Sequence, residues 1–142
     1  MILIALLAIP LAAGVLSFAA RKRQVMEAIN VCAAAAIFLL AIGLGAKVLS
    51  DGEVMALGGF LYADALSALV VGLTALVALL STAYAVGYLR QDERAGAFAD
   101  APAKLRKYYS LTPLFIAAMM LVALANNLGV MWVAIEATTL AS

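Results

Sequence analysis

The charged residues of this chain divide it into long apolar segments, and these segments limit the fold more than any motif does. A helix needs about 20 apolar residues to cross a hydrocarbon core about 30 Å thick. Segments suited to that task are expected at five places, of which the last is incomplete: residues 2–20, 25–49, 65–89, 111–125 and 128–142. We therefore expect an all-α, polytopic bundle with about four complete transmembrane spans and an incomplete fifth.

The composition supports a membrane protein and argues against a nucleic-acid-binding one. Hydrophobic residues make up 68% of the chain and charged residues 12%, whereas a soluble domain is about half apolar and about a quarter charged. The net charge is only +1, and nucleic acid binding requires a concentrated basic surface. We expect the lipid bilayer to surround the chain, and we treat residues 1–142 as one membrane domain.

The chain has no histidine and a single cysteine, Cys32. Histidine is the commonest ligand of haem and transition metals, and iron–sulfur clusters need a set of cysteines. One cysteine can form neither an intramolecular disulfide nor a CxxC site, so we expect Cys32 to be a small buried apolar residue. No cofactor or metal site is expected in this chain, and any electron transfer linked to it would take place on a partner.

The distribution of lysine and arginine predicts the orientation of the helices, because cytoplasmic loops are enriched in both residues. Basic residues gather at residues 21–23 and again in the segment 90–107, whereas residues 50–64 carry three acids. We expect the two basic loops to be cytoplasmic and the N-terminus to lie outside. The 90–107 segment alternates in charge sign, so we expect a solvated connector there. The first apolar segment is followed, not preceded, by basic residues, which indicates a retained span rather than a signal peptide.

Polar residues beside the spans are expected to cap helices. Either Asn126 or Asn127 can cap the helix that follows, and Asp64 precedes the 65–89 span with a carboxylate that suits a helix N-terminus. Pro113 is expected in a first helical turn, where its missing donor is harmless. Hydroxyls inside the spans usually bond to nearby carbonyls or across to a neighbouring helix, so they are weak functional signals: Thr74, Ser81, Thr82, Thr138 and Thr139.

A lone carboxylate, Glu136, lies in the otherwise uncharged stretch "NNLGVMWVAIEATTLAS". If the helix begins at Leu128, the acid lies about 12 Å into the membrane, near its midplane. An ionised acid at that depth costs at least about 2.5–3.5 kcal/mol, so such residues persist mainly beside a partner charge or a wet cavity. We expect Glu136 to be the protonatable group of a proton pathway, supported by Trp132 and Thr139 on the same side of the helix. The alternative is an acid that only joins two helices.

Glu136 has no cationic partner in this sequence, because the spans hold no lysine, arginine or histidine near the midplane. As a helix, residues 128–142 cover about 22 Å, which is short of a crossing. We therefore expect the chain to be the N-terminal part of a longer protein, in which a later helix supplies the partner.

Two stretches carry a resemblance to a known family. The sequences "LYADALSALVVGLTALVALLSTAYAVGYLR" and "YYSLTPLFIAAMMLVALANNLGVMWVAIEATTLAS" resemble the antiporter-like proton-translocating subunits shared by respiratory complex I, Mrp-type cation/proton antiporters and membrane-bound nickel–iron hydrogenases. The segment "NNLGVMWVAIEATTL" is most similar to component F of the hydrogenase-4 and formate hydrogenlyase type. Residues 1–60 add little beyond their hydropathy.

The resemblance implies the N-terminal portion of a fold of about 14 helices, built from two inverted five-helix repeats. Glu136 corresponds to the family's fifth-helix glutamate, which pairs with a lysine on a later helix. The implied function is proton or sodium-ion translocation in a complex-I-like redox-driven pump of the inner (cytoplasmic) membrane, most similar to a hydrogenase or formate hydrogenlyase complex. The implied partners are other membrane subunits and peripheral subunits that carry the nickel–iron and iron–sulfur centres.

Three alternatives remain open from the sequence. The chain could be a subunit of an Mrp-type antiporter with no redox partner, or a subunit of NADH–quinone oxidoreductase. An alternative of another class is a non-transporting structural membrane subunit, in which Glu136 would tolerate replacement by Gln or Leu.

Overall fold

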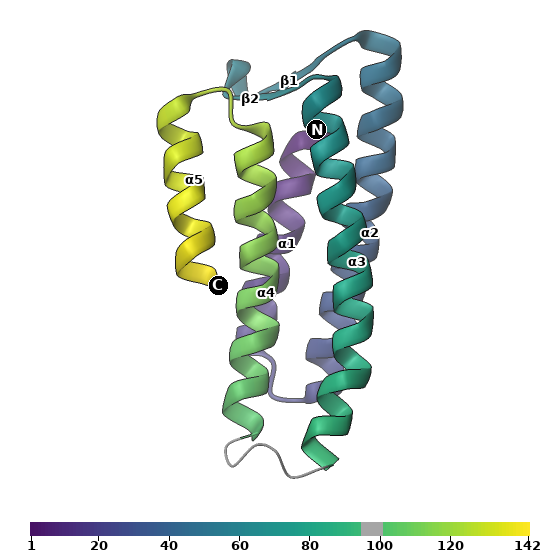
Figure 1. The fold of residues 1–142 in the computed structure, drawn as a ribbon, viewed down its shortest axis with the longest axis vertical. Helices are drawn as coiled ribbons and strands as arrows, with labels where there is room; N and C mark the ends of the chain where they lie inside the picture. Colours follow the sequence, from purple (N-terminus) through teal and green to yellow (C-terminus); the bar gives the residue numbers. More distant parts are fainter. Residues whose placement is uncertain (95–100) are drawn as a thin grey trace.

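The computed structural model describes residues 1–94 and 101–142. The described residues form five α-helices and a β-hairpin, in this order: α1 (Ile2–Ala19), α2 (Arg23–Asp51), β1 (Val54–Ala56), the short 3-10 helix η1 (Leu57–Gly59), β2 (Leu61–Ala63), α3 (Ala65–Arg94), α4 (Ala101–Leu124) and α5 (Leu128–Ala141). Helices α1 to α4 run alternately up and down as a bundle, and α5 packs beside α4 (Figure 1). The prediction of an all-α bundle is confirmed.

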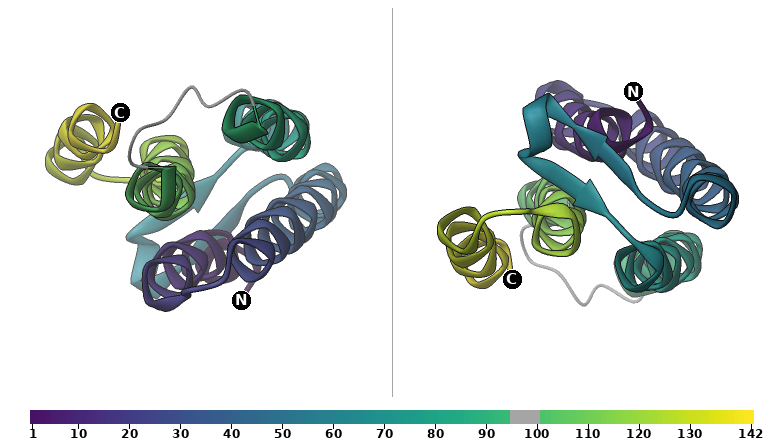
Figure 2. Two further views of the ribbon diagram at one scale, coloured as in Figure 1. Left: turned by 90° about the horizontal axis from the view of Figure 1, so that it is seen from below. Right: turned by 90° about the horizontal axis from the view of Figure 1, so that it is seen from above.

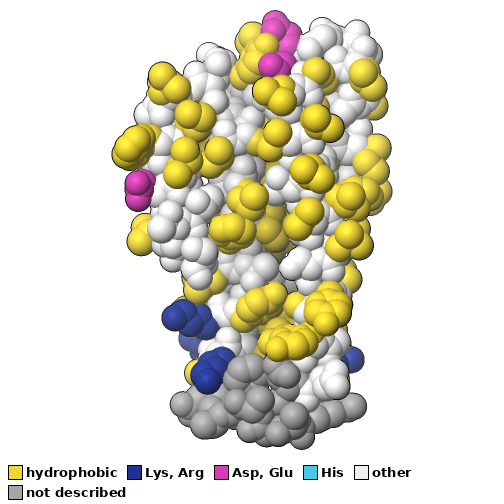
Figure 3. Space-filling view, viewed as in Figure 1, with side chains coloured by type: hydrophobic (Ala, Val, Ile, Leu, Met, Phe, Trp, Pro, Cys, Tyr) yellow, Lys and Arg dark blue, Asp and Glu magenta, His cyan; other side chains and the backbone are white. Residues whose placement is uncertain are grey.

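Large apolar side chains fill the centre of the bundle and also cover its outside (Figure 3). Leu3, Leu6 and Leu44 are fully buried, whereas Leu69 and Leu80 of α3 are 70% and 62% exposed. Soluble monomers rarely expose continuous apolar surface on this scale. Among the described residues, α1 to α4 are each long and apolar enough to cross a membrane. The chain therefore has the architecture of a multi-pass membrane protein.

Helices α1 and α4 pack against each other at Gly14. A Cβ atom at this position would lie 2.8 Å from both Cγ and Cδ2 of Leu114, and 3.1 Å from the carbonyl oxygen of Ser110. Small residues allow membrane helices to pack at short distances, where van der Waals contacts are most numerous. At Gly14 the present spacing between α1 and α4 leaves no room for a Cβ atom.

The acidic loop at residues 50–64, for which the sequence suggested no regular structure, contains the β-hairpin. Strands β1 and β2 pair antiparallel, and the turn between them has positive φ angles at Leu57, Gly58 and Gly59. The hairpin lies across one end of the bundle (Figure 2). The side-chain amide of Asn126 donates to the Gly59 carbonyl at 2.8 Å. This hydrogen bond ties the α4–α5 turn to the hairpin.

Helices α3 and α4 extend beyond the apolar segments that predicted them. Helix α3 continues to Arg94, and α4 begins at Ala101 rather than at Leu111, so both described ends of the predicted connector over 90–107 are helical, and its solvation stays a prediction. Its middle, residues 95–100, lies outside the described residues. Arg, Lys, Gln, Glu, Leu and Ala are all good helix formers, and charge alone does not end a helix. As a result Pro113 lies inside α4 rather than in its first turn.

Cys32 does not have the position expected for it. Its side chain is exposed on the surface of α2 instead of being buried. A small sulfur-containing side chain is compatible with a lipid-facing position, so its apolar character gave no information about which face of the helix it occupies.

Candidate functional site

Helix α5 begins at the predicted residue and has the predicted type of cap. The side-chain oxygen of Asn127 accepts hydrogen bonds from the backbone N–H groups of Gly129 at 2.8 Å and Val130 at 3.4 Å. Glu136 lies eight residues after Leu128, which corresponds to about 12 Å along the helix axis. The predicted cap is therefore confirmed for Asn127.

The side chain of Glu136 is exposed on the outer side of α5, together with those of Trp132 and Thr139. On the face drawn in Figure 3, acidic side chains appear at the hairpin end and over α5, where apolar side chains surround them. The hydroxyl of Thr139 donates to the carbonyl of Ile135 at 3.3 Å. Within the described part of the chain, no side chain forms an ion pair or a hydrogen bond with Glu136. The three predicted residues thus share one face of the helix, which the described residues leave uncovered.

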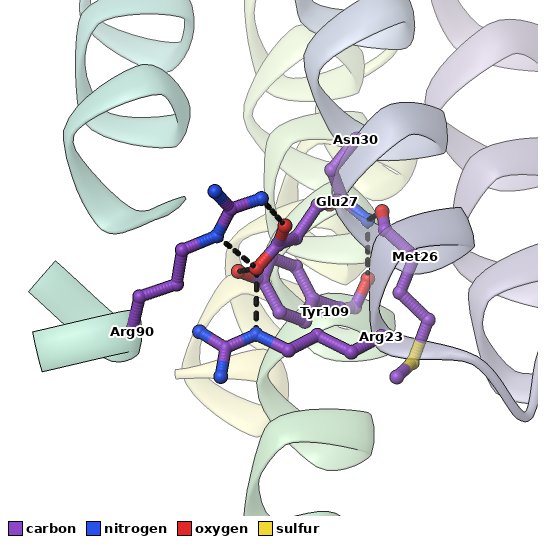
Figure 4. Close-up of polar contacts among 6 residues, drawn as sticks. All are labelled: Arg23, Met26, Glu27, Asn30, Arg90 and Tyr109. Carbon is purple, nitrogen blue, oxygen red and sulfur yellow. Dashed lines mark hydrogen bonds and ion pairs between the residues drawn. The ribbon is translucent and has the colours of Figure 1, made fainter. Parts of the chain in front are cut away.

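A second carboxylate, Glu27, lies at a junction of three helices near the start of α2 (Figure 4). Glu27 is only 4% exposed. Its Oε1 accepts from Nε of Arg23 at 2.7 Å, and its Oε2 accepts from Nη2 of Arg90 on α3 at 2.5 Å. The hydroxyl of Tyr109 on α4 lies 3.5 Å from Oε1. We call these four residues the Glu27 cluster. Buried charges require such partners, and here the partners join α2, α3 and α4.

Asn30, one turn after Glu27, completes the contacts at this junction. Its side-chain amide lies 2.9 Å from the Ser17 hydroxyl and 3.0 Å from the carbonyl oxygens of Met26 and Tyr109, so three acceptors share its two hydrogens. Pro113 stands four residues after Tyr109 and has no N–H with which to pair that carbonyl. Asn30 on α2 therefore supplies the donor that α4 itself lacks.

Neither Glu27 nor Asn30 is among the site residues predicted from the sequence, although both lie inside the predicted span 25–49. Two signals could have found them. Arg23 stands four residues before Glu27, which is the spacing of an ion pair on a helix. Ionisable residues within a span are usually paired with another polar group, so Glu27 itself indicates a partner. The partners Arg90 and Tyr109 are 63 and 82 residues away in the chain, so only the packing of the helices reveals them.

Several hydroxyl-bearing residues of two different spans lie around one cavity. A cavity of about 250 Å³ lies between α3 and α4, and four of its lining residues carry hydroxyls: Thr74, Ser81, Thr82 and Thr112. The remaining lining residues are apolar. Hydroxyl groups can hold water in such a space, but they do not titrate in the physiological range.

Neither the protein-family models nor the curated proteins with which the sequence was compared gave a match. Among the described residues, no three His, Cys, Asp or Glu side chains are close enough to hold a metal ion. The two arrangements that bear on function are therefore the uncovered acid of α5 and the Glu27 cluster with its neighbour Asn30.

Proposed function

We propose that this chain is a proton- or sodium-translocating membrane subunit of a complex-I-like redox-driven pump, and that Glu136 is its protonatable group. The observation that carries the proposal is the position of Glu136. It is a single acid, eight residues into an apolar helix, on a face that the described residues do not cover. The resemblance of residues 61–90 and 108–142 to antiporter-like subunits agrees with this assignment.

The uncovered face of α5 needs a polar or charged partner if Glu136 is to ionise. An ionised carboxylate in contact with lipid costs several kcal/mol, so intramembrane acids normally face another polar group or water. Desolvation favours the neutral acid, whereas a nearby cation favours the ionised form. A further helix that placed a lysine over the exposed side of α5 would balance these two effects. Movement of that lysine would then load or release a proton.

Partner subunits would supply the parts of the pump that this chain lacks. Other membrane subunits would continue the ion pathway, and peripheral subunits of a hydrogenase or formate hydrogenlyase type would carry the nickel–iron and iron–sulfur centres. The assembly would lie in the cytoplasmic membrane, with the basic end of the bundle on the cytoplasmic side.

The test replaces Glu136 by Gln in the assembled complex and measures proton uptake per turnover in sealed vesicles. We expect proton uptake to be lost, because Gln has nearly the same shape but cannot titrate. The matched control is Glu53→Gln, which removes an exposed carboxylate outside the spans and should leave uptake unchanged. An assembled Glu136→Gln complex that pumps like the wild type would overturn the proposal and favour a structural subunit.

A second pair of variants tests the supporting role of Thr139. The hydroxyls of Thr138 and Thr139 both donate to the Ile135 carbonyl, but only Thr139 lies one turn after Glu136 on the same side of the helix. We expect Thr139→Val to lower the rate of proton uptake more than Thr138→Val does. Equal effects of the two substitutions would remove Thr139 from the pathway.

A further inference from the structure

A groove with a volume of about 930 Å³ lies at the end of the bundle opposite the hairpin. It is formed by the C-terminal end of α1, the turn into α2 and the first turns of α4. We call it the basic groove, and its principal lining residues are Phe18, Arg21, Arg23, Arg106, Lys107 and Ser110. Neither Glu136 nor the cavity between α3 and α4 contributes to it.

The lining of the basic groove combines positive charge with apolar surface. Four of its residues are basic, and none of its lining residues in the described part of the chain is acidic. Arg23 shares its charge with Glu27, so Arg21, Arg106 and Lys107 supply most of the field. The guanidinium of Arg106 lies 4.5 Å from the centre of the Phe18 ring, a contact that positions the cation.

Ser110 provides an independent indication of a ligand. Ser110 is 5% exposed and is one of the residues that line the groove. Among the described residues, its hydroxyl oxygen has no hydrogen-bond partner. Buried polar groups are normally paired with protein, water or a bound molecule. A hydroxyl without a partner beside several cations suits a ligand that carries acceptor oxygens.

We propose that the basic groove binds the phosphate headgroup of an anionic phospholipid. Arginine and lysine recognise phosphate oxygens through charge-assisted hydrogen bonds, and basic pockets between helices at a membrane surface suit anionic headgroups. The exposed ring of Phe18 and the half-buried side chain of Leu111 offer apolar surface for the glycerol and upper acyl chains. A free phosphate ion would leave that surface in contact with water. This inference does not depend on the function proposed for Glu136.

Native mass spectrometry of the chain in a neutral detergent tests this proposal, with phosphatidylglycerol and phosphatidylcholine as the probes. We expect phosphatidylglycerol to bind more tightly. Because each cation near a membrane surface contributes about fivefold in affinity, R106Q/K107Q should weaken phosphatidylglycerol binding by about 25-fold. The matched control is Lys22→Gln, which removes a cation at the same end of the bundle but outside the groove lining, and it should have a much smaller effect.

A charge-preserving variant separates lost binding from lost folding. Arg106→Lys with Lys107→Arg keeps both charges and should retain phosphatidylglycerol binding, and circular dichroism checks the helix content of every variant. Equal binding of the two lipids, or equal losses in R106Q/K107Q and the Lys22→Gln control, would refute the proposal. Displacement of phosphatidylglycerol by millimolar inorganic phosphate would show that a free anion, and not a lipid, is the ligand.

Discussion

Replacing Gly14 by Ala tests whether close packing of α1 against α4 determines the stability of this bundle. Carbon atoms pack best at about 3.5–4.0 Å, whereas the new Cβ would lie 2.8 Å from two atoms of Leu114. The overlap is thus about 0.7–1.2 Å, and the backbone carbonyl of Ser110 at 3.1 Å limits movement on that side. Overpacking of this kind costs about 1–3 kcal/mol.

The matched control is Gly72→Ala in α3, because a Cβ atom at Gly72 meets nothing within 4 Å. Both substitutions gain about 0.5–1 kcal/mol of helix propensity, so the difference between them isolates the clash. We expect Gly14→Ala to unfold more easily than Gly72→Ala, by about 1–3 kcal/mol in free energy of unfolding. Reversible denaturation in mixed micelles, followed by circular dichroism, measures this difference.

A double mutant identifies the atoms that clash. Adding Leu114→Ala removes Cγ and Cδ2, so it should make the Gly14→Ala substitution less costly, although the contact with Ser110 remains. The reasoning is refuted if Gly14→Ala and Gly72→Ala change stability equally, since the two helices would then tolerate a methyl group between them without cost.

Three further predictions concern polar contacts. Asn30→Leu should lower the free energy of unfolding by about 1–3 kcal/mol, because it leaves the buried Tyr109 carbonyl without a donor. Adding Pro113→Ala gives α4 an N–H for that carbonyl and should recover part of the lost stability; no recovery would contradict this pairing. Asp64 accepts the Ser67 N–H at 2.8 Å, which lowers the pKa of its carboxyl. Its stabilisation of the α3 N-terminus is therefore complete above the unfolded pKa of about 3.9 and is lost as the pH falls through the lower folded pKa. Hydrogen exchange of the first α3 amides should show this acid loss in the wild type but not in Asp64→Asn. Glu27→Gln should measurably lower the free energy of unfolding, but by no more than about 3 kcal/mol, because both arginine partners keep contact with solvent. An unchanged denaturation curve would contradict this, since the ion pairs would then contribute nothing to stability.

The sequence predicts helix boundaries well where a polar side chain itself makes the boundary. Asp64 and Asn127 both accept backbone N–H groups at the starts of α3 and α5. Hydropathy does not predict the C-terminal end of α3 or the N-terminal end of α4. It reports where the apolar surface stops and not where the helix stops. Most of the residues at 90–94 and 103–107 are polar or charged but favour helix, so each helix extends past the end of its apolar segment.

The candidate site was predictable only in part, for a related reason. The position of Glu136 within α5 follows from counting residues, since a helix rises by a fixed distance per residue. The Glu27 cluster depends on which faces of α2, α3 and α4 meet, and neither spacing nor composition determines that. The β-hairpin was missed because it is short and rests on a glycine turn with positive φ angles.

The hydrogen bond from Asn30 to the Tyr109 carbonyl has a consequence for biosynthesis. Before α4 packs against α2, the Tyr109 carbonyl has no donor within its own helix because Pro113 lacks an N–H, and burying that carbonyl unpaired would cost about 1–3 kcal/mol. The donor that resolves this is on α2, which the ribosome completes earlier, because domains and segments emerge from the N-terminus first. Helix α2 is thus already present when α4 is made. The hydrogen bond from Asn30 to the Tyr109 carbonyl then favours packing of α4 against α2 over its release into the surrounding lipid.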